Sequence, residues 1–467
     1  MIPVTAFVGF VLVATAMTFR DRRLGIFFII VVGALQDPVR KITPDTPAIL
    51  VLSSLPIWFA MGHQLLRGGW RSFSQTFPQL SWAMRLFMIS LPLPVFITLA
   101  YGAAAWRLAA IGLFGYLAPL AGIVLGFVYA RRVKDVERLL TFYCLVTCVS
   151  LVGGPIEYLG LAQGQPAIGT EVLGAVWVRT GVDTALNLIS GFYRSPDIMG
   201  WHAATVVMLG LTVALHRRYR RSSWLLTAAG FGVVCLLLSG RRKMLMMPAV
   251  WASLVILYWL RTGRASRVVT LLLAGFATAA AVYYASGEIG IEQGYFEYAA
   301  SSAREGRARV IEGSWGAVMT TIAQSGILGG GIGVATQGAQ HLDLGRLQSW
   351  QESGPSRIMV ELGVPGFVCA IVLLFAVARA CARRLAEPSG AASLALGLMA
   401  FAAANAACFA VSHQVYGDVV ILTLASFGLG LALSAPEWSG ISEKRPLRPH
   451  VLAEHWQPRR ASPRGED

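Results

Sequence analysis

Cations beside turns and glycines are the first candidates for chemistry in this sequence. Arg194 lies in GFYRSPDIMG, directly before a Ser-Pro turn that leads into an apolar run. A helix beginning there would present unsatisfied N–H donors and a partial positive charge, so this arginine could help to bind an anion. The simpler alternative is a structural arginine that pairs with Asp183 or Asp197.

A second candidate is the segment SGRRK, in which Arg241, Arg242 and Lys243 follow one another. Three adjacent like charges repel each other, and a bound polyanion would offset that repulsion. The alternative is a turn at a cytoplasmic membrane surface, where anionic lipids would attract the same cations. SGRRK therefore predicts either a polyanion site or a contact with a membrane surface.

The third candidate is EGRARVIEGSW with the arginine directly before it: Arg304 precedes Glu305, and Arg307 and Arg309 lie between that glutamate and Glu312. Charges three or four residues apart commonly pair along the solvated face of a helix, and that is the alternative to a binding role. Both interpretations stay open for these three arginines.

The segment QSWQESGPSRIMVELGVPG supplies the acid–base candidates. Glu352 lies two residues before a Gly-Pro dipeptide, which predicts a turn there. From a turn, its side chain could project into a cavity. A glutamate that faces several arginines is a candidate general base, and His341, earlier in the same stretch, is the second choice. Arg357 is a further anion-binding candidate. It is four residues from Glu361, so the two could instead form an ion pair at a helix end.

A glycine cluster, GILGGGIG, lies between the last two candidates at residues 326–333. No strand precedes it and no GK[ST] follows it, so it does not match a phosphate-binding loop. Glycines allow backbones to approach closely, and we expect this loop to pack directly against helices.

Composition places these residues in a membrane protein. The chain has 467 residues, of which 55% are hydrophobic and only 13% charged, whereas a soluble protein would have about a quarter charged residues. Its mean hydropathy is +0.61. Apolar runs of about 20 residues recur, and that is the length that crosses a bilayer. The net charge of +15 therefore predicts contact with lipid and not with nucleic acid, and the six cysteines are expected to be packing residues.

The fold class predicted is all-α, a polytopic transmembrane bundle of about 12 or 13 spans with one large extracytoplasmic loop. The span at 24–37 is the weakest of the set. The predicted spans are 3–19, 24–37, 47–62, 83–101, 108–130, 139–158, 200–215, 223–239, 244–260, 268–286, 358–378, 391–411 and 418–434.

Basic connections alternate with less basic ones along this series. Most of the 39 lysines and arginines fall in one set, which the positive-inside rule assigns to the cytoplasm together with the C-terminal tail. The other set is then extracytoplasmic: the loop near Arg40, the turn 101–107, the stretch 159–199, the turn 240–243, the loop 287–357 and the turn 413–417.

This map divides the chain into six parts. The stretch 159–199 is of mixed polarity with a helix-like segment near 171–189, which suits a position at the membrane interface. The parts are the N-terminal helices 1–158, the interfacial segment 159–199, the central helices 200–286, the loop 287–357 expected to carry the catalytic residues, the C-terminal helices 358–436, and a disordered cytoplasmic tail 437–467.

The order of the motifs resembles that of the O-antigen polymerase and ligase superfamily of bacterial membrane glycosyltransferases. GFYRSPDIMG is followed by SGRRK, by Arg307 and Arg309 before Trp315, by GGGIG, and by a polar position nine residues before the glutamate of ELGVPG. The resemblance covers roughly residues 190–380.

The resemblance implies a metal-independent, cofactor-free enzyme of the bacterial inner membrane, with its active site facing the periplasm. It would use undecaprenyl-pyrophosphate-linked glycans as donor and acceptor, beside a flippase and a chain-length regulator. The arginines expected to hold the pyrophosphate are Arg194, Arg241 or Arg242, and Arg307 or Arg309.

The chain departs from the ligases at one position. Ligases place His-Asn nine residues before the glutamate, whereas this chain has Glu352-Ser353 there, so the resemblance favours a polymerase of exopolysaccharide or O-antigen. A glycan ligase remains an alternative. So does a transporter or flippase for an anionic lipid-linked substrate, although such proteins usually have charges at mid-membrane and internal repeats.

Overall fold

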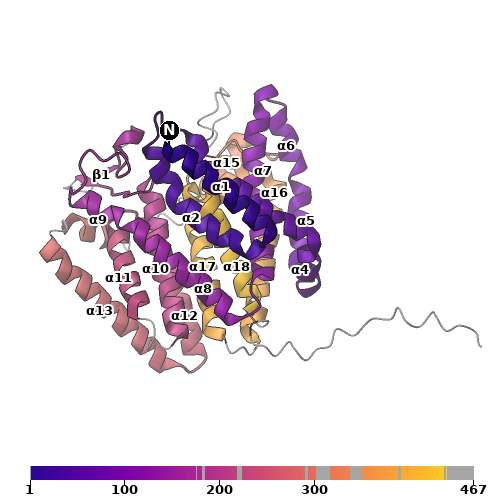
Figure 1. Ribbon diagram of the computed structural model, residues 1–467. Helices are drawn as coiled ribbons and strands as arrows, with labels where there is room; N and C mark the ends of the chain where they lie inside the picture. Colours follow the sequence, from indigo (N-terminus) through magenta and orange to yellow (C-terminus); the bar gives the residue numbers. More distant parts are fainter. Residues whose placement is uncertain are drawn as a thin grey trace, which may run out of the picture.

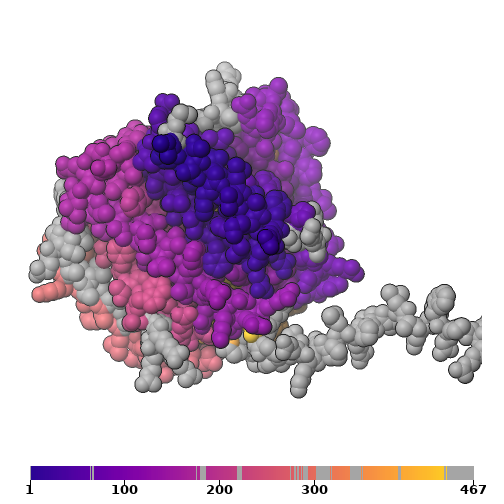
Figure 2. Space-filling view, in the orientation of Figure 1, coloured from indigo at the N-terminus to yellow at the C-terminus, as the bar shows by residue number. Residues whose placement is uncertain are grey.

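The computed structural model describes residues 2–174, 176–180, 185–217, 223–289, 293–300, 316–336, 349, 351–387, 391–435 and 438. Apolar runs fold here into helices that pack side by side, because a helix satisfies its own backbone hydrogen bonds within an apolar segment. The N-terminal helices spread over one face of the bundle, as Figures 1 and 2 show.

Residues 2–158, all of which the structure describes, contribute nine α-helices. These are α1 (Ile2–Arg20), α2 (Arg22–Lys41), α3 (Leu55–Gln64), α4 (Trp70–Thr76), α5 (Pro78–Ser90), α6 (Pro92–Leu99), α7 (Trp106–Tyr129), α8 (Val133–Leu151) and α9 (Gly153–Tyr158). Short turns of helix accompany them: η1 (Ala48–Leu52), η2 (Leu65–Gly69), η3 (Ala103–Ala105) and η4 (Glu171–Leu173).

The second half begins after a small hairpin of β1 (Val178–Thr180) and β2 (Ala185–Asn187). Its helices are α10 (Pro196–His216), α11 (Ser223–Leu238), α12 (Arg242–Arg261), α13 (Ala265–Ile289), α15 (Ala317–Ser325), α16 (Gly354–Ala386), α17 (Ala392–Val411), η8 (Gln414–Gly417) and α18 (Val419–Leu433). Residues 293–300 are also helical.

Eight of the helical segments in the described part of the chain are long and apolar enough to cross a membrane. Four shorter apolar helices coincide with further predicted spans, at 48–63, 223–238, 265–277 and 419–433. The weakest predicted span, 24–37, lies in α2, which is in neither group. The prediction of a helical chain with many apolar helices of membrane-crossing length is therefore confirmed for eight helical segments.

The helix α10 forms the centre of the bundle. In its apolar stretch 89% of the residues are buried, compared with 22% in that of α1 at the periphery. It packs against α8, α11, α12 and α17. Large apolar side chains such as Ile89, Phe276 and Phe375 are instead exposed at 74%, 75% and 71%. An apolar rim around a packed centre is the arrangement expected of a protein surrounded by lipid.

The hairpin corrects one prediction. The sequence predicts a helix-like segment near 171–189, but β1 and β2 pair antiparallel there, with Val178 opposite Asn187 and Thr180 opposite Ala185. Glycines at 174 and 181 limit the apolar stretch to a few residues, and Trp177 and Val178 favour strands. A segment this short gains more from pairing across a turn than from a single turn of helix.

The glycine cluster packs as the sequence predicts, by direct contact between backbones. The Gly330 N–H donates to the carbonyl oxygen of Val360 at 2.7 Å, and the Val364 N–H donates to that of Ile327 at 2.8 Å. Between these bonds Gly363 has a φ of +65°, which kinks α16. A Cβ atom at Gly363 would overlap the backbone of Leu328, so only glycine fits.

The predicted extracytoplasmic connections, as far as the structure describes them, gather at one end of the bundle. Lys41 donates to the carbonyl oxygens of Gly191 and Tyr193, and the Tyr101 hydroxyl donates to that of Gly330. In Figure 1, β1 and α6 lie toward this end, at the top of the view, and α4 lies toward the other. We call this the polar end.

The large loop predicted at 287–357 is described only in part. Residues 293–300 and α15 are helical, and α13 extends to Ile289. The predicted disordered tail, 437–467, lies outside the described residues except for Trp438.

Candidate functional site

Arg194 is held by two carboxylates at the polar end. Its Nη1 lies 2.9 Å from Asp37 Oδ1 and its Nη2 lies 2.6 Å from Asp418 Oδ2. The Arg194 backbone N–H also donates to Asp37. The two aspartate side chains are 1% and 2% exposed, whereas that of Arg194 is 17% exposed. Burial alone would lower the pKa of Arg194, but the two carboxylates raise it above its ordinary value.

These partners replace the ones that the sequence suggests. Arg194 pairs with Asp37 and Asp418, and not with Asp197; Asp183 lies outside the described residues. Asp418 also accepts hydrogen bonds from the first N–H groups of α18, so it serves as the cap of that helix. Arg194 thereby ties α2, α10 and α18 together.

Asp197 instead faces the basic segment. It lies in the first turn of α10, and its two carboxylate oxygens are 2.8 Å from Arg241 Nη2 and 2.8 Å from Lys243 Nζ. From the sequence alone, a bound polyanion would be needed to offset the repulsion among the three cations. In the structure, Asp197 offsets part of that repulsion. Asp197 is thus paired with two of these three cations, Arg241 and Lys243.

Aromatic rings cover two members of that run. The Arg241 guanidinium lies 4.9 Å from the ring centroid of Trp177, and that of Arg242 lies 4.1 Å from the ring centroid of Tyr298. Cation–π contacts hold an arginine in place without neutralising its charge. We call Arg241, Arg242 and Lys243 the basic cluster. It places three positive charges side by side at the start of α12.

The basic cluster is connected to the turn that carries Glu352. Lys243 Nζ donates to the hydroxyl of Ser412 at 2.7 Å and to the side-chain oxygen of Gln414 at 3.0 Å. Between them, the backbone N–H of His413 donates to the carbonyl oxygen of Glu352 at 2.9 Å. The Glu352 side chain is exposed, next to the Ser353 cap of α16.

His413 is a buried, neutral anchor for this connection. Its Nε2 is 2.8 Å from the carbonyl oxygen of Gln351, a geometry in which Nε2 carries the proton and donates. Burial, together with the nearby charges of Arg357 and Lys243, lowers the pKa of His413 to about 3.

Arg357 and Glu361 form the ion pair that their spacing predicts, with Arg357 Nε 3.4 Å from Glu361 Oε1. Both are buried, and the guanidinium lies 5.6 Å from the ring centroid of Tyr116. Glu361 Oε1 also accepts the backbone N–H of Ala335, directly after the glycine cluster. The pair thus fastens the glycine loop to α16.

The structure brings together several of the predicted site residues. Arg194, Arg241, Arg242, Arg357 and Glu352 all lie at the polar end. His341, Arg307 and Arg309 lie outside the described residues. Within the described residues no group of three or more His, Cys, Asp and Glu side chains is arranged to hold a metal ion.

Sequence reasoning missed Asp37, Asp418 and His413. Asp37 lies inside α2, whereas His413 and Asp418 lie in the turn before α18, and the partners of all three are far along the chain. One signal was available: an aspartate directly before the apolar run of α18 is a strong N-cap candidate. No protein family and no curated protein matches this chain.

Proposed function

We propose that this protein is a membrane glycosyltransferase that polymerises lipid-pyrophosphate-linked oligosaccharide units at the polar end. The unit would be an undecaprenyl-pyrophosphate-linked glycan, on the periplasmic side of a bacterial inner membrane. The observation that carries the proposal is the connection between the basic cluster and Glu352 through residues 412–414. This connection joins the basic cluster to the turn that carries an exposed carboxylate.

Transfer of a glycan from a lipid pyrophosphate creates negative charge on the leaving group. Guanidinium groups can stabilise that charge with pairs of parallel hydrogen bonds to the phosphate oxygens. Because two carboxylates already neutralise Arg194, we assign this role to the basic cluster. Arg194 then acts as a positioning residue.

Glu352 would act as the general base. The acceptor hydroxyl oxygen attacks the anomeric carbon, the bond from that carbon to the pyrophosphate oxygen breaks, and the hydroxyl proton passes to the Glu352 carboxylate. The lipid pyrophosphate leaves with the bonding electrons. A single displacement of this kind inverts the anomeric configuration.

Purified protein in lipid nanodiscs, given a lipid-pyrophosphate-linked oligosaccharide, tests the proposal. Wild-type protein should produce a ladder of longer lipid-linked glycans on a gel. Arg242→Gln should raise the apparent KM about fivefold or more, because one phosphate-binding cation is lost. Its matched control is Arg107→Gln, a cation at the same end that stacks on Trp106.

Three outcomes are informative. A ladder from wild type, with a higher KM for Arg242→Gln alone, supports the polymerase. Transfer of a single glycan to a lipid acceptor, without a ladder, favours the ligase. Movement of intact substrate across the bilayer without any new glycosidic bond would replace the enzyme with a transporter.

A further inference from the structure

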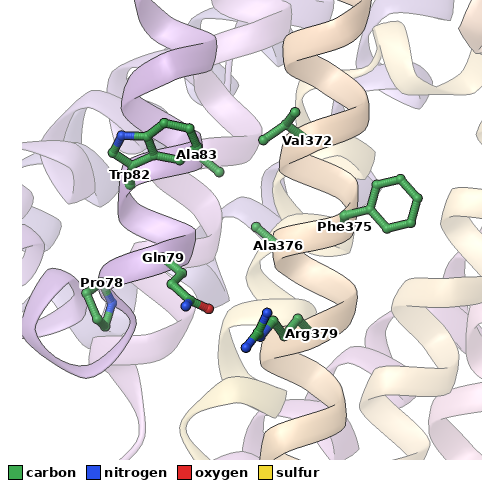
Figure 3. Close-up of a pocket in the computed structure, with 8 residues that line it drawn as sticks. All are labelled: Pro78, Gln79, Trp82, Ala83, Val372, Phe375, Ala376 and Arg379. Carbon is green, nitrogen blue, oxygen red and sulfur yellow. The ribbon is translucent and has the colours of Figure 1, made fainter.

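A groove runs between α5 and α16 at the end of the bundle opposite the polar end. Its volume is about 470 Å³, and the residues that line it come from the first turns of α5 and the second half of α16. Figure 3 shows the two helices side by side with the groove between them. The lining residues are Pro78, Gln79, Trp82, Ala83, Val372, Phe375, Ala376 and Arg379.

The groove is apolar along most of its length. Ala83, Val372 and Ala376 form its wall, and the rings of Trp82 and Phe375 are 59% and 71% exposed beside it. Small side chains at Ala83 and Ala376 leave the space between the helices open. A surface of this kind within a membrane-crossing helix pair accommodates an acyl chain.

One end of the groove is polar and positively charged. Figure 3 shows Gln79 and Arg379 at the same end, below Trp82 and Val372. Arg379 is exposed, and no described residue forms a hydrogen bond or ion pair with it. Further along α16, Arg384 lies 4.7 Å from the ring centroid of Phe77, the residue before Pro78, and pairs with Glu387 at 2.8 Å.

The start of α5 adds to this positive end. Its N-cap, Phe77, provides no side-chain acceptor and Pro78 has no N–H, so the N–H groups of Gln79 and Leu80 are the ones without a partner in the helix. Those groups and the helix dipole favour an anion. Cations, an amide and a helix N-terminus therefore lie at one end of an apolar groove.

The location of this positive end matches a lipid head group. It belongs to the set of basic connections that charge sorting assigns to the cytoplasm, where the leaflet contains anionic lipid. A tryptophan one turn of helix into the groove, at Trp82, is also typical of the level where head groups meet acyl chains.

We propose that this groove binds one glycerophospholipid with an anionic head group from the inner leaflet. The phosphate lies against Arg379, Gln79 and the start of α5, and an acyl chain lies along Ala83, Val372 and Ala376. The site is independent of the polar end, and it requires no assumption about the reaction there.

Thermal unfolding of the purified protein in detergent tests this site. The probes are phosphatidylglycerol, phosphatidylcholine and inorganic phosphate, each titrated separately. Phosphatidylglycerol should raise the Tm at lower concentrations than phosphatidylcholine, and inorganic phosphate should have no effect at matched concentrations. Mass spectrometry of the purified protein should detect phosphatidylglycerol retained from the membrane.

Two variants separate the head-group contact from the groove. Arg379→Gln should weaken the response to phosphatidylglycerol about fivefold, as expected for the loss of one cation near a head group. Ala376→Trp fills the groove without changing charge and should abolish the retained lipid. The matched control is Arg383→Gln, an exposed cation in the same helical end that does not line the groove.

Several results would overturn the proposal. Equal responses to phosphatidylglycerol and phosphatidylcholine would show a non-selective lipid contact. A full response to inorganic phosphate would show an ion site without a lipid. Equal losses in Arg379→Gln and Arg383→Gln would show general surface charge, and an unchanged Arg379→Gln would remove the head-group contact even if Ala376→Trp does not fold.

Discussion

The backbone N–H of His413 donates a hydrogen bond to the carbonyl oxygen of Glu352 at 2.9 Å. This bond joins the loop between α17 and α18 to the turn that opens α16, while the Glu352 side chain stays exposed. The position of the carboxylate is therefore fixed through its backbone, and its side chain can be changed without disturbing the bundle.

Glu352→Gln should reduce polymerisation by about 10²- to 10⁴-fold, the usual contribution of a general base. Its Tm should match that of wild type, because an exposed side chain is replaced by one of nearly the same shape. The assay is the rate per folded molecule on lipid-linked substrate. Glu171→Gln, an exposed glutamate in η4, is the control and should keep full activity. Near wild-type activity in Glu352→Gln would disprove its role as base and make His341 the next candidate.

Arg194→Lys should lower stability more than specific activity. A lysine cannot bridge Asp37 and Asp418 as the guanidinium does, so one buried carboxylate loses its partner. We expect a loss on the order of 2 kcal/mol in the free energy of unfolding. Chemical denaturation measures it, with the exposed Arg132→Lys as control. A stable variant without activity would instead place Arg194 on the substrate.

Gly363→Ala should destabilise the protein by roughly 1–3 kcal/mol. The residue has a φ of +65°, and a Cβ atom there would overlap the backbone of the glycine loop. Gly316→Ala is the control, since a Cβ atom at Gly316 meets no atom within 4 Å and its φ is −57°. The difference in Tm between the two variants is the measurement. If both variants melt together, the kink does not depend on glycine.

Acid should destabilise the protein through His413. Its pKa is about 3 when folded and about 6.5 when unfolded, so between these values the unfolded state binds more protons. The contribution of His413 to stability is fully present above about pH 6.5 and is lost as the pH falls toward 3, with a loss on the order of 2 kcal/mol at pH 5. His413→Gln should flatten the dependence of Tm on pH over this range. His63→Gln, at an exposed histidine, should not. Parallel pH profiles for wild type and His413→Gln would contradict this assignment.

Membrane sidedness can be tested with single cysteines. A cysteine at Gln163, exposed at the polar end, should react with a membrane-impermeant maleimide in intact cells. A cysteine at Lys134, exposed at the opposite end, should react only after permeabilisation. The parent protein without an added cysteine is the control. The reverse pattern would place the polar end in the cytoplasm.

The sequence predicts well those features that depend on local composition. The length of the apolar runs identifies the eight helical segments that could cross a membrane. The four-residue spacing of Arg357 and Glu361 predicts their ion pair. The close packing of the glycine cluster could also be predicted, because glycine has no side chain to keep two backbones apart.

Partners that are distant in sequence could not be predicted in the same way. Asp37 and Asp418 are 157 and 224 residues from Arg194, and nothing in the local pattern selects them over the nearer Asp197. The hairpin after η4 was missed because three-residue strands carry too little periodicity to compete with a helical interpretation.

The kink at Gly363 also sets a length. The apolar part of α16 beyond it runs from Val364 to the residue before Arg379, and at about 1.5 Å per residue it would span roughly 22 Å, less than the hydrocarbon thickness of about 30 Å. Its upper limit is fastened to the glycine loop, so this segment cannot slide along its axis to meet a thicker bilayer. Local thinning of the lipid would have to make up the difference. Hydrophobic mismatch beside α16 therefore becomes a variable that an experiment with lipids of different chain length can change.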